Sequence, residues 1–274
     1  MRRHCLGFGL IALSGTALAQ PLSGPDQFPQ FRNASGLPGG LFGVSADGRP
    51  TMLGAMTIST PIGYSLGHNH FALGFANMSK DRTLRFPQSR TNNDNANGTG
   101  FGMIGLTSRY GHVTLSGMVL SGIGDTTLNV QYQPNIPRLP KGLGVSFGVQ
   151  DAFSSGGSAG VRRPEDGRTS RSFFGVATYE AAPGVHLSVG KGDRRFRGLF
   201  GSASVNLGKR VKVFVENDTF NTNYGIGWNV GPLKRREDEK YLLTSESDPY
   251  RGDVFLTLGI IRQSRAFWGV AVTF

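Results

Sequence analysis

The sequence has almost no cysteine, and the one it has lies at the extreme N-terminus. Cys5 is the single cysteine among 274 residues. It precedes the apolar stretch Leu6–Leu13 instead of ending it, where a lipoprotein signal would need it. The remainder of the chain therefore excludes disulfides, cysteine nucleophiles and zinc–thiolate sites.

The sequence also lacks an apolar run of transmembrane-helix length at its N-terminus. The stretch Leu6–Leu13 is shorter than the roughly 20 residues that span a bilayer as a helix. It follows the basic residues Arg2 and Arg3 and leads to Ala17-Leu18-Ala19, an A-x-A-like cleavage site. We therefore expect residues 1–19 to be a cleaved signal peptide.

Helical periodicity and known enzyme motifs are missing from the chain after the predicted signal peptide. No segment after residue 20 keeps apolar residues at i, i+3, i+4 and i+7, so helices should be few and short. There is no P-loop, no dinucleotide fingerprint and no H-E-x-x-H motif. His68 and His70 could bring two imidazoles to one strand face, but no third ligand is evident. The sequence predicts a non-enzymatic protein without metal or cofactor.

Glycine and positive charge are abundant. The chain has 41 glycines, roughly double average usage, without a collagen period, which favours curved, close-packed sheets. The net charge of +11 falls to +9 when Arg2 and Arg3 leave with the signal, and the basic residues cluster in predicted loops. Behind a secretion signal, lipopolysaccharide phosphates or acidic glycans are better partners than nucleic acid. Solvated loop charge is the equally weighted alternative.

Apolar and polar residues alternate along many segments. In 127–133, Leu128, Val130 and Tyr132 are apolar, whereas Thr127, Asn129, Gln131 and Gln133 are polar. A soluble sandwich alternates as well. Two features favour a membrane barrel: the segments cluster near the ~9 to 11 residues that a tilted transmembrane strand needs, and their polar faces carry small side chains.

The C-terminal segment is a third such feature. Trp268, Val270, Val272 and Phe274 share one face, with an aromatic residue near each end as in an interfacial girdle. A terminal phenylalanine that closes an alternating strand resembles the assembly signal of outer-membrane barrels. The resemblance implies recognition of these four residues by the barrel-assembly machinery.

The predicted fold is therefore all-β, a transmembrane antiparallel up-and-down β-barrel of about 12 to 14 strands. We expect residues 20–40 to be an extended periplasmic leader or lumen insert and residues 41–274 to form the barrel. The candidate strands are 41–46, 51–60, 69–77, 100–109, 112–121, 125–133, 142–151, 172–180, 184–191, 198–207, 210–217, 221–230, 253–262 and 265–274. The first is weak and interrupted by glycine, so a barrel of twelve strands remains possible.

Turn lengths predict an orientation. The connections at 110–111, 181–184 and 208–210 are tight, as periplasmic turns are, whereas 78–99 and 152–171 are long and polar, as extracellular loops are. The stretch 231–252 is long yet falls on the periplasmic side. Either the strand register is wrong there, or the stretch folds back as a plug or docking segment.

A succession of short motifs resembles a known family. The motifs are Gly148–Asp151, Leu187–Gly192, Arg197–Gly201, Val213–Asp218 and Asn223–Gly227, with Gly40–Val44 through Ala46–Gly48 upstream. Their order is similar to the YjbH-type exopolysaccharide-biosynthesis family. The resemblance implies a Gram-negative outer-membrane barrel that takes part in polysaccharide production or secretion, with polysaccharide and periplasmic export components as partners.

The same resemblance points to a polar cluster. It implies that Glu216, Asp218 and Asn223 face each other across a hairpin near the extracellular rim, and Asp151 belongs to the same group of rim residues. These side chains could hydrogen-bond sugar hydroxyls or a cation. The alternative is a salt link to lumen cations such as Lys212.

Two other functions remain open from the sequence. One is a general diffusion porin, for which a basic lumen would favour anions. The other is an outer-membrane hydrolase: His186 and Ser188 stand two apart, so they project to the same strand face within reach of each other. That chemistry needs the pair turned toward lipid, and here Val185, Leu187 and Val189 take that face.

Overall fold

The computed structural model describes residues 34–78, 98–120, 125–153, 171–196, 198–219, 221–232, 252–261 and 265–274. These residues form twelve β-strands and one short 3-10 helix, and no helix among them is long and apolar enough to span a membrane. The strands are β1 (Phe71–Met78), β2 (Gly98–Ser108), β3 (Gly111–Leu120), β4 (Asp125–Pro134), β5 (Leu143–Gln150), β6 (Ser172–Ala182), β7 (Val185–Gly192), β8 (Gly198–Asn206), β9 (Val211–Asn217), β10 (Thr222–Pro232), β11 (Asp253–Ile261) and β12 (Arg265–Thr273). The 3-10 helix is η5 (Arg194–Phe196), between β7 and β8.

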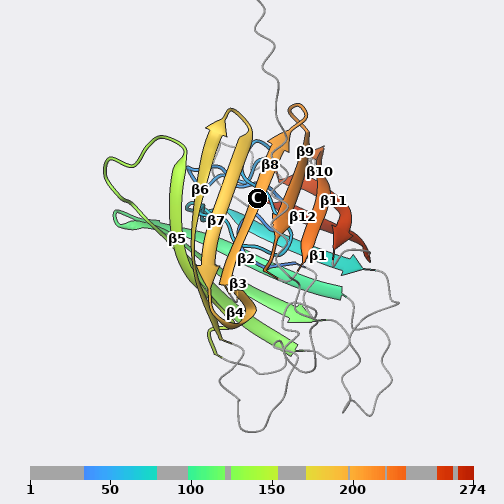
Figure 1. Ribbon diagram of the computed structural model, residues 1–274, viewed down its shortest axis with the longest axis horizontal. Coiled ribbons are helices and arrows are strands. Elements are labelled where there is room, and N and C mark those ends of the chain that lie inside the picture. The colour runs from blue at the N-terminus through green and yellow to red at the C-terminus, as the bar shows by residue number, and fades with distance from the viewer. Residues whose placement is uncertain are drawn as a thin grey trace, which may run out of the picture.

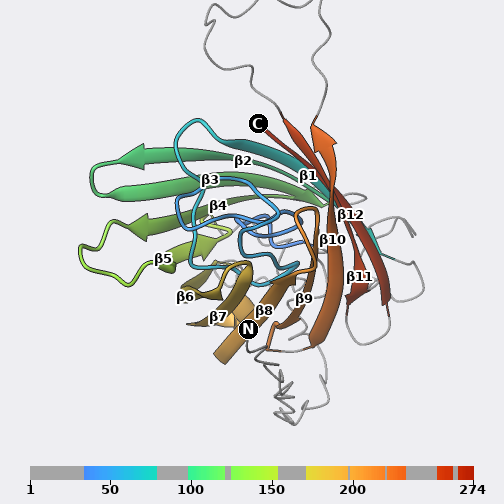
Figure 2. The same ribbon diagram turned by 90° about the horizontal axis from the view of Figure 1, so that it is seen from above.

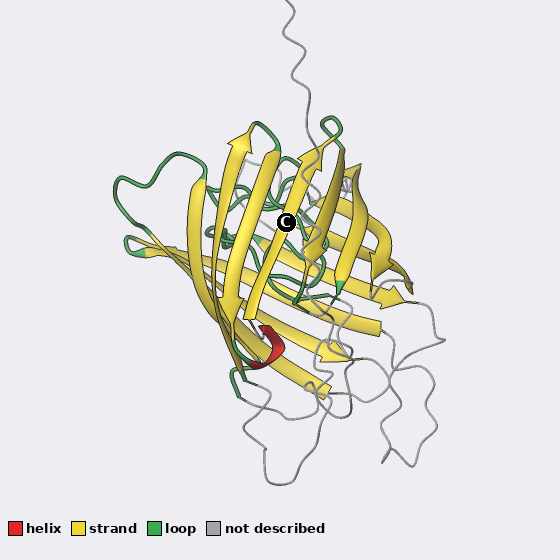
Figure 3. Cartoon of the chain, in the orientation of Figure 1, coloured by secondary structure: helices red, strands yellow, loops and turns green. Residues whose placement is uncertain are grey.

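The strands close into a ring (Figure 1, Figure 3). Each pairs antiparallel with the next along the chain, and β1 pairs with β12 in the register Ala72↔Thr273 to Met78↔Phe267. Closure satisfies the backbone groups that a free sheet edge would leave exposed to lipid. The predicted antiparallel up-and-down barrel is confirmed. Each strand begins and ends within two residues of one of the last twelve candidate segments.

The outer surface is apolar, the reverse of a water-soluble protein. Alternation sends one face of every strand outward, and the exposed side chains there are aliphatic or aromatic. They include Leu73, Val119, Phe147, Phe173, Leu187, Val189, Leu199, Tyr224, Ile226, Trp228, Leu258, Ile260 and Trp268. An apolar belt of this kind is the lipid-facing surface of a transmembrane barrel.

Exposed aromatic residues gather at both ends of the barrel. Phe71 and Phe274 lie at the end where β1 begins and β12 stops, and their backbones exchange two hydrogen bonds of 2.9 and 3.0 Å. Phe173 and Trp268 lie at the opposite end, where β6 and β12 begin. We call the first end the terminal end and the second the loop end. Two aromatic rows fit the two membrane–water interfaces.

Residues 34–70, which we call the plug, fill the lumen instead of adding strands to the wall (Figure 2). The candidate strands 41–46 and 51–60 are therefore wrong, and the barrel begins at Phe71 instead of residue 41. In the plug those segments make only isolated bridges, Gly40↔Thr57, Val44↔Pro50 and Val44↔Ala55. Gly39 precedes the first segment and Gly48 separates the two, with φ of 89° and 85°, values that favour glycine turns.

The plug crosses the lumen from one end to the other. Ser35 accepts a hydrogen bond from Gln150 near the loop end, and His70 accepts one from the Gly105 backbone near the terminal end. The predicted lumen insert is thus located for residues 34–40, and the buried segment continues to the start of β1. The predicted signal peptide lies outside the described residues.

The three turns predicted to be tight lie at one end of the barrel. The turns at 109–110, 183–184 and 207–210 are tight and lie at the terminal end. β10 stops and β11 starts at this end too, because Asp253 pairs with Thr273. The long stretch 231–252 is therefore on the side of the tight turns in the observed register as well. Its residues 233–251 lie outside the described residues, as do most of 78–99 and 152–171.

Inward phenylalanines explain part of the glycine content. Four of them lie over the glycine directly opposite on the neighbouring strand, where a Cβ would come within 2.3 Å of the ring. The pairs are Gly74 with Phe101, Gly148 with Phe174, Gly190 with Phe200 and, at 2.2 Å, Gly225 with Phe214. An aromatic ring that covers a cross-strand glycine restores packing at a site without a side chain.

Candidate functional site

The lumen wall has two chemically different parts. Strands β11, β12, β1 and β2, which we call the apolar arc, turn side chains such as Phe255, Phe267, Ala72 and Phe101 toward the plug. Strands β3 to β9, which we call the polar arc, turn mostly hydroxyl, amide and charged side chains toward it. The plug therefore meets mainly apolar packing on one side and mainly hydrogen bonds on the other, with exceptions such as the bond from Thr257 of β11 to the Leu41 carbonyl at 3.0 Å.

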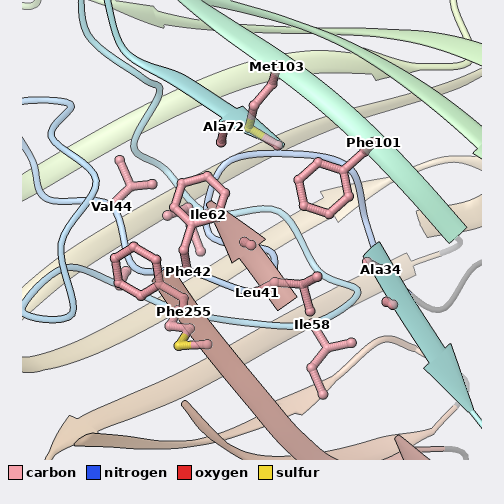
Figure 4. Packing of buried hydrophobic residues seen from close by; sticks show 14 of the residues in the cluster. Ala34, Leu41, Phe42, Val44, Ile58, Ile62, Ala72, Phe101, Met103 and Phe255 are labelled. Atoms are coloured by element: carbon pink, nitrogen blue, oxygen red, sulfur yellow. The ribbon is translucent and has the colours of Figure 1, made fainter. Parts of the chain in front are cut away.

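Van der Waals packing joins the plug to the apolar arc (Figure 4). The rings of Phe42 and Phe255 have centroids 6.1 Å apart and are tilted by 46°. Leu41 lies over Gly269 of β12, where a Cβ would come within 2.7 Å of a leucine methyl. All of these side chains are buried, so this contact is a small hydrophobic core inside the barrel.

Hydrogen bonds from side chains join the plug backbone to the polar arc. Gln131 of β4 donates from Nε2 to the carbonyls of Ile62 and Tyr64, both at 3.0 Å. Gly63 donates its N–H to Thr178 Oγ1 of β6 at 2.7 Å and accepts from Ser146 of β5 at 2.9 Å. The wall thus supplies the partners that the irregular plug backbone lacks within itself.

Glu216 of β9 is the most heavily used group of the polar arc. Its carboxylate accepts the backbone N–H groups of three successive plug residues, Ile58 at 3.0 Å, Ser59 at 2.9 Å and Thr60 at 3.1 Å. It also accepts the hydroxyls of Ser59 and Thr60 and, at 2.8 Å, the Nδ2 of Asn223. A carboxylate with this many donors is a strong, charge-assisted anchor.

The predicted polar cluster is assembled, but it faces the plug. Asn223 donates to Glu216 and, at 3.3 Å, to Asp218 Oδ2, so the three predicted residues lie together near the loop end. Glu216 is 1 % exposed, and its oxygens are occupied by plug donors. The predicted alternative, a salt link to Lys212, is not what engages it: Lys212 Nζ donates to the Gly184 carbonyl at 3.4 Å.

Asp151 lies apart from this hydrogen-bonded group. It follows β5 with a φ of 58°, and its backbone N–H donates to Asn129 Oδ1 at 3.0 Å. Its side chain is buried at the loop end of the polar arc. The structure therefore places it at the predicted rim.

His186 and Ser188 point into the lumen, as the strand parity predicts. Leu187 and Val189 between and beside them are exposed on the lipid face. Ser188 shares a hydrogen bond of 2.7 Å with Thr178, and the His186 ring lies edge-on to Tyr64 with centroids 6.1 Å apart. The hydroxyl is thus paired with a threonine, and His186 Nδ1 has no hydrogen-bond partner among the described residues.

The C-terminal strand has the predicted facing. Trp268, Val270, Val272 and Phe274 lie on the lipid face, whereas Phe267, Ala271 and Thr273 are buried in the lumen. The Trp268 ring packs against Phe75 of β1 with centroids 5.7 Å apart, across the seam that closes the ring. Recognition of these residues by an assembly machinery stays a prediction.

One buried cation was not singled out by the sequence. Arg195, in η5 at the loop end, is 6 % exposed, although it lies between two predicted strands, where a basic residue is expected to be solvated loop charge. Nothing in the local pattern marks Arg195 as buried and Arg194 as exposed. In the described part of the chain, no group of three or more His, Cys, Asp or Glu side chains could hold a metal ion.

Comparisons with known proteins add little beyond the fold. No family model matches the chain, and no curated protein matches it. Among solved structures the chain is similar to one described as "KdgM porin in complex with disordered oligogalacturonate", with a TM-score of 0.41 and 6% sequence identity. The match covers 74% of this chain and 98% of that one.

Proposed function

We propose that this chain is a porin-like channel of the bacterial outer membrane whose pore is closed at rest by residues 34–70. The observation that carries the proposal is the divided lumen wall, polar over β3 to β9 and apolar over β11 to β2. A pore needs a wettable wall, and the polar arc is one. The plug keeps that wall covered in the closed state.

The two kinds of contact predict how the pore opens. Hydrogen bonds from Gln131, Thr178 and Glu216 to the plug can be exchanged for hydrogen bonds to water, so their net contribution is small once water enters. The apolar packing of Phe42 on Phe255 has no such substitute, because water cannot replace it. We infer that the plug separates from the polar arc and stays on the apolar arc.

This proposal modifies the general diffusion porin predicted from the sequence. An unobstructed lumen would conduct at all times, whereas here plug residues such as Phe42, Ile58 and Tyr64 are fully buried inside the ring. The role in exopolysaccharide production that the YjbH resemblance implies stays a prediction. A channel for a polymer and a gated pore for small solutes would both use the polar arc.

Crosslinking tests the gating directly, because the chain after Cys5 has no cysteine. Ser59 Oγ and Asn223 Nδ2 are 3.2 Å apart across the interface. We expect the Ser59→Cys/Asn223→Cys protein, joined through two disulfides by a short bis(methanethiosulfonate) reagent, to lose its conductance in planar bilayers and to regain it on reduction. Ser59→Cys alone, treated with the same reagent, is the control.

Two results would overturn the proposal. One is the absence of any conductance, including after substitution of Glu216. The other is conductance that persists unchanged when the plug is crosslinked to β10, since that current would not pass between plug and wall.

A further inference from the structure

Arg195 is fixed against the lumen by its neighbours. The adjoining Phe196 packs on Phe174 and Phe200, with ring centroids 5.0 and 5.5 Å apart, in a cluster that also contains Leu37 of the plug. The backbone N–H of Arg195 donates to Ser172 Oγ at 3.2 Å. The helix η5 is therefore anchored by apolar contacts, and Arg195 is held at the loop end of the polar arc.

Two of the three guanidinium nitrogen atoms of Arg195 are buried without a hydrogen-bond partner among the described residues. These are Nε and Nη1, which are inaccessible to solvent. The charges of the Asp218 and Glu216 carboxylates act on Arg195, and both carboxylates already accept hydrogen bonds, from Asn223 and, for Glu216, also from the plug. A buried, unpaired cation is costly, so a protein that keeps one has a use for it or pairs it with a ligand.

We propose that the Arg195 guanidinium binds the oxyanion of a soluble carboxylate or phosphate compound at the loop end of the lumen. Two N–H groups of a guanidinium form a planar fork that matches the two oxygens of either anion. The side chain lies inside the ring, in the field of Glu216 and Asp218, which face the lumen. Its ligand therefore arrives from water and not from the lipid around the barrel.

The charge of Arg195 suits this ligand class. Burial lowers the pKa of Arg195 to about 10, and the Asp218 and Glu216 carboxylates oppose that shift. The guanidinium is thus positive at neutral pH, where carboxylates and phosphates are ionised. The same two carboxylates disfavour an incoming anion, so we expect a modest dissociation constant, on the order of 0.1 to 1 mM.

The site does not depend on the gating mechanism. Arg195 lies in η5 at the loop end, and a binding measurement there needs no current through the lumen. Binding without conductance would therefore leave this inference standing while the proposed channel fails. Conductance without anion binding would leave the proposed channel standing and overturn the Arg195 site.

Calorimetry on the folded barrel in detergent tests the proposal. The probes are inorganic phosphate and glucuronate, with glucose as the uncharged control. We expect Arg195→Gln to weaken binding of both anions at least about tenfold, because it removes the charge from the fork. Arg195→Lys keeps the charge without the fork and should lose less. The matched control is Arg194→Gln, which removes the exposed neighbouring charge on the same helix and should change little.

Three outcomes would overturn the proposal. The native barrel could fail to bind either anion at 10-fold above the expected dissociation constant, glucose could bind as well as glucuronate, or Arg194→Gln could weaken binding as much as Arg195→Gln. Closed barrels migrate anomalously when unheated, so electrophoresis with and without heating verifies that each variant is folded. If Arg195→Gln does not fold, Arg195→Lys and the anion-against-glucose comparison on the native protein decide.

Discussion

The two sides of the plug are held by different forces, although they lie in one small lumen. On the apolar arc, Phe42, Leu41 and Met56 are packed against Phe255, Gly269 and Gly227, the last where β10 borders this arc. On the polar arc, the backbone from Ile58 to Leu66 is bonded to side chains of five strands, β3, β4, β5, β6 and β9. Packing fixes where the plug rests, and hydrogen bonds fix which way its backbone is turned.

The difference also separates stability from gating. The apolar arc includes the β1–β12 seam that closes the ring, so losing its packing weakens the barrel as a whole. The polar arc lies away from that seam, and its contacts have a substitute in water. Substitutions on the apolar arc should therefore lower the stability of the barrel, whereas substitutions on the polar arc should change its conductance.

The largest effect should come from Glu216→Ala. The substitution leaves the N–H groups of Ile58, Ser59 and Thr60 buried without an acceptor, and each such loss costs about 1 to 3 kcal/mol. We expect the plug to release locally, with higher conductance in planar bilayers and faster proteolysis within 34–70. Glu216→Gln, which keeps one oxygen acceptor, should lie between. Native-like conductance in Glu216→Ala would contradict the division between the arcs.

Phe255→Ala should give the second largest effect and a different defect. Truncating a buried phenylalanine typically costs about 3 to 5 kcal/mol, and Phe255 is fully buried against Phe42. We expect a lower midpoint of urea unfolding for the whole barrel, with little change in resting conductance. Phe147→Ala, on the exposed lipid face of β5, is the control. A selective rise in conductance without loss of stability would assign gating to the apolar arc.

Period-two alternation was enough to locate the wall. It fixes which residues point inward, so the twelve strands, the lumen face of His186 and Ser188, and the lipid face of Trp268 and Phe274 all followed from local sequence. It could not separate wall from plug. The segments 41–46 and 51–60 also have alternating residues, but in the plug the adjacent Leu41 and Phe42 both pack on the apolar arc, against Gly269 and Phe255.

The surroundings of the polar cluster were beyond local pattern. Residues two apart on a strand share a face, which places Glu216 and Asp218 together. Pairing of β9 with β10 sets Asn223 opposite Glu216. What Glu216 contacts is decided by residues 156 to 158 positions earlier in the chain, and no local signal encodes that distance. Arg195 was missed for a related reason, because its burial depends on Phe196 packing and not on its own neighbours in sequence.

Gly144→Ala should disturb the contact between the plug and the polar arc less than Glu216→Ala does. A Cβ at Gly144 would lie 2.4 Å from the Tyr64 ring and 2.7 Å from the Gly63 carbonyl oxygen, so the plug must move away from β5. Overpacking of this kind costs about 1 to 3 kcal/mol, and we expect a moderate rise in conductance. Gly117→Ala is the matched control, because a Cβ there meets nothing within 4 Å. Equal behaviour of the two variants would show that the plug is not seated on β5.

The smallest effect should come from Ser188→Ala, which also tests the hydrolase alternative. Ser188 shares its hydrogen bond with Thr178, which already accepts from Gly63 of the plug, so the loss of the hydroxyl leaves Thr178 engaged. We expect a loss of about 1 kcal/mol in the free energy of unfolding and almost no change in conductance. Thr178→Val, which removes both bonds, should cost more and loosen the plug. Purified native barrel should hydrolyse neither phospholipid nor ester substrates, and an activity abolished by Ser188→Ala alone would restore the enzyme hypothesis and make the polar arc an active site.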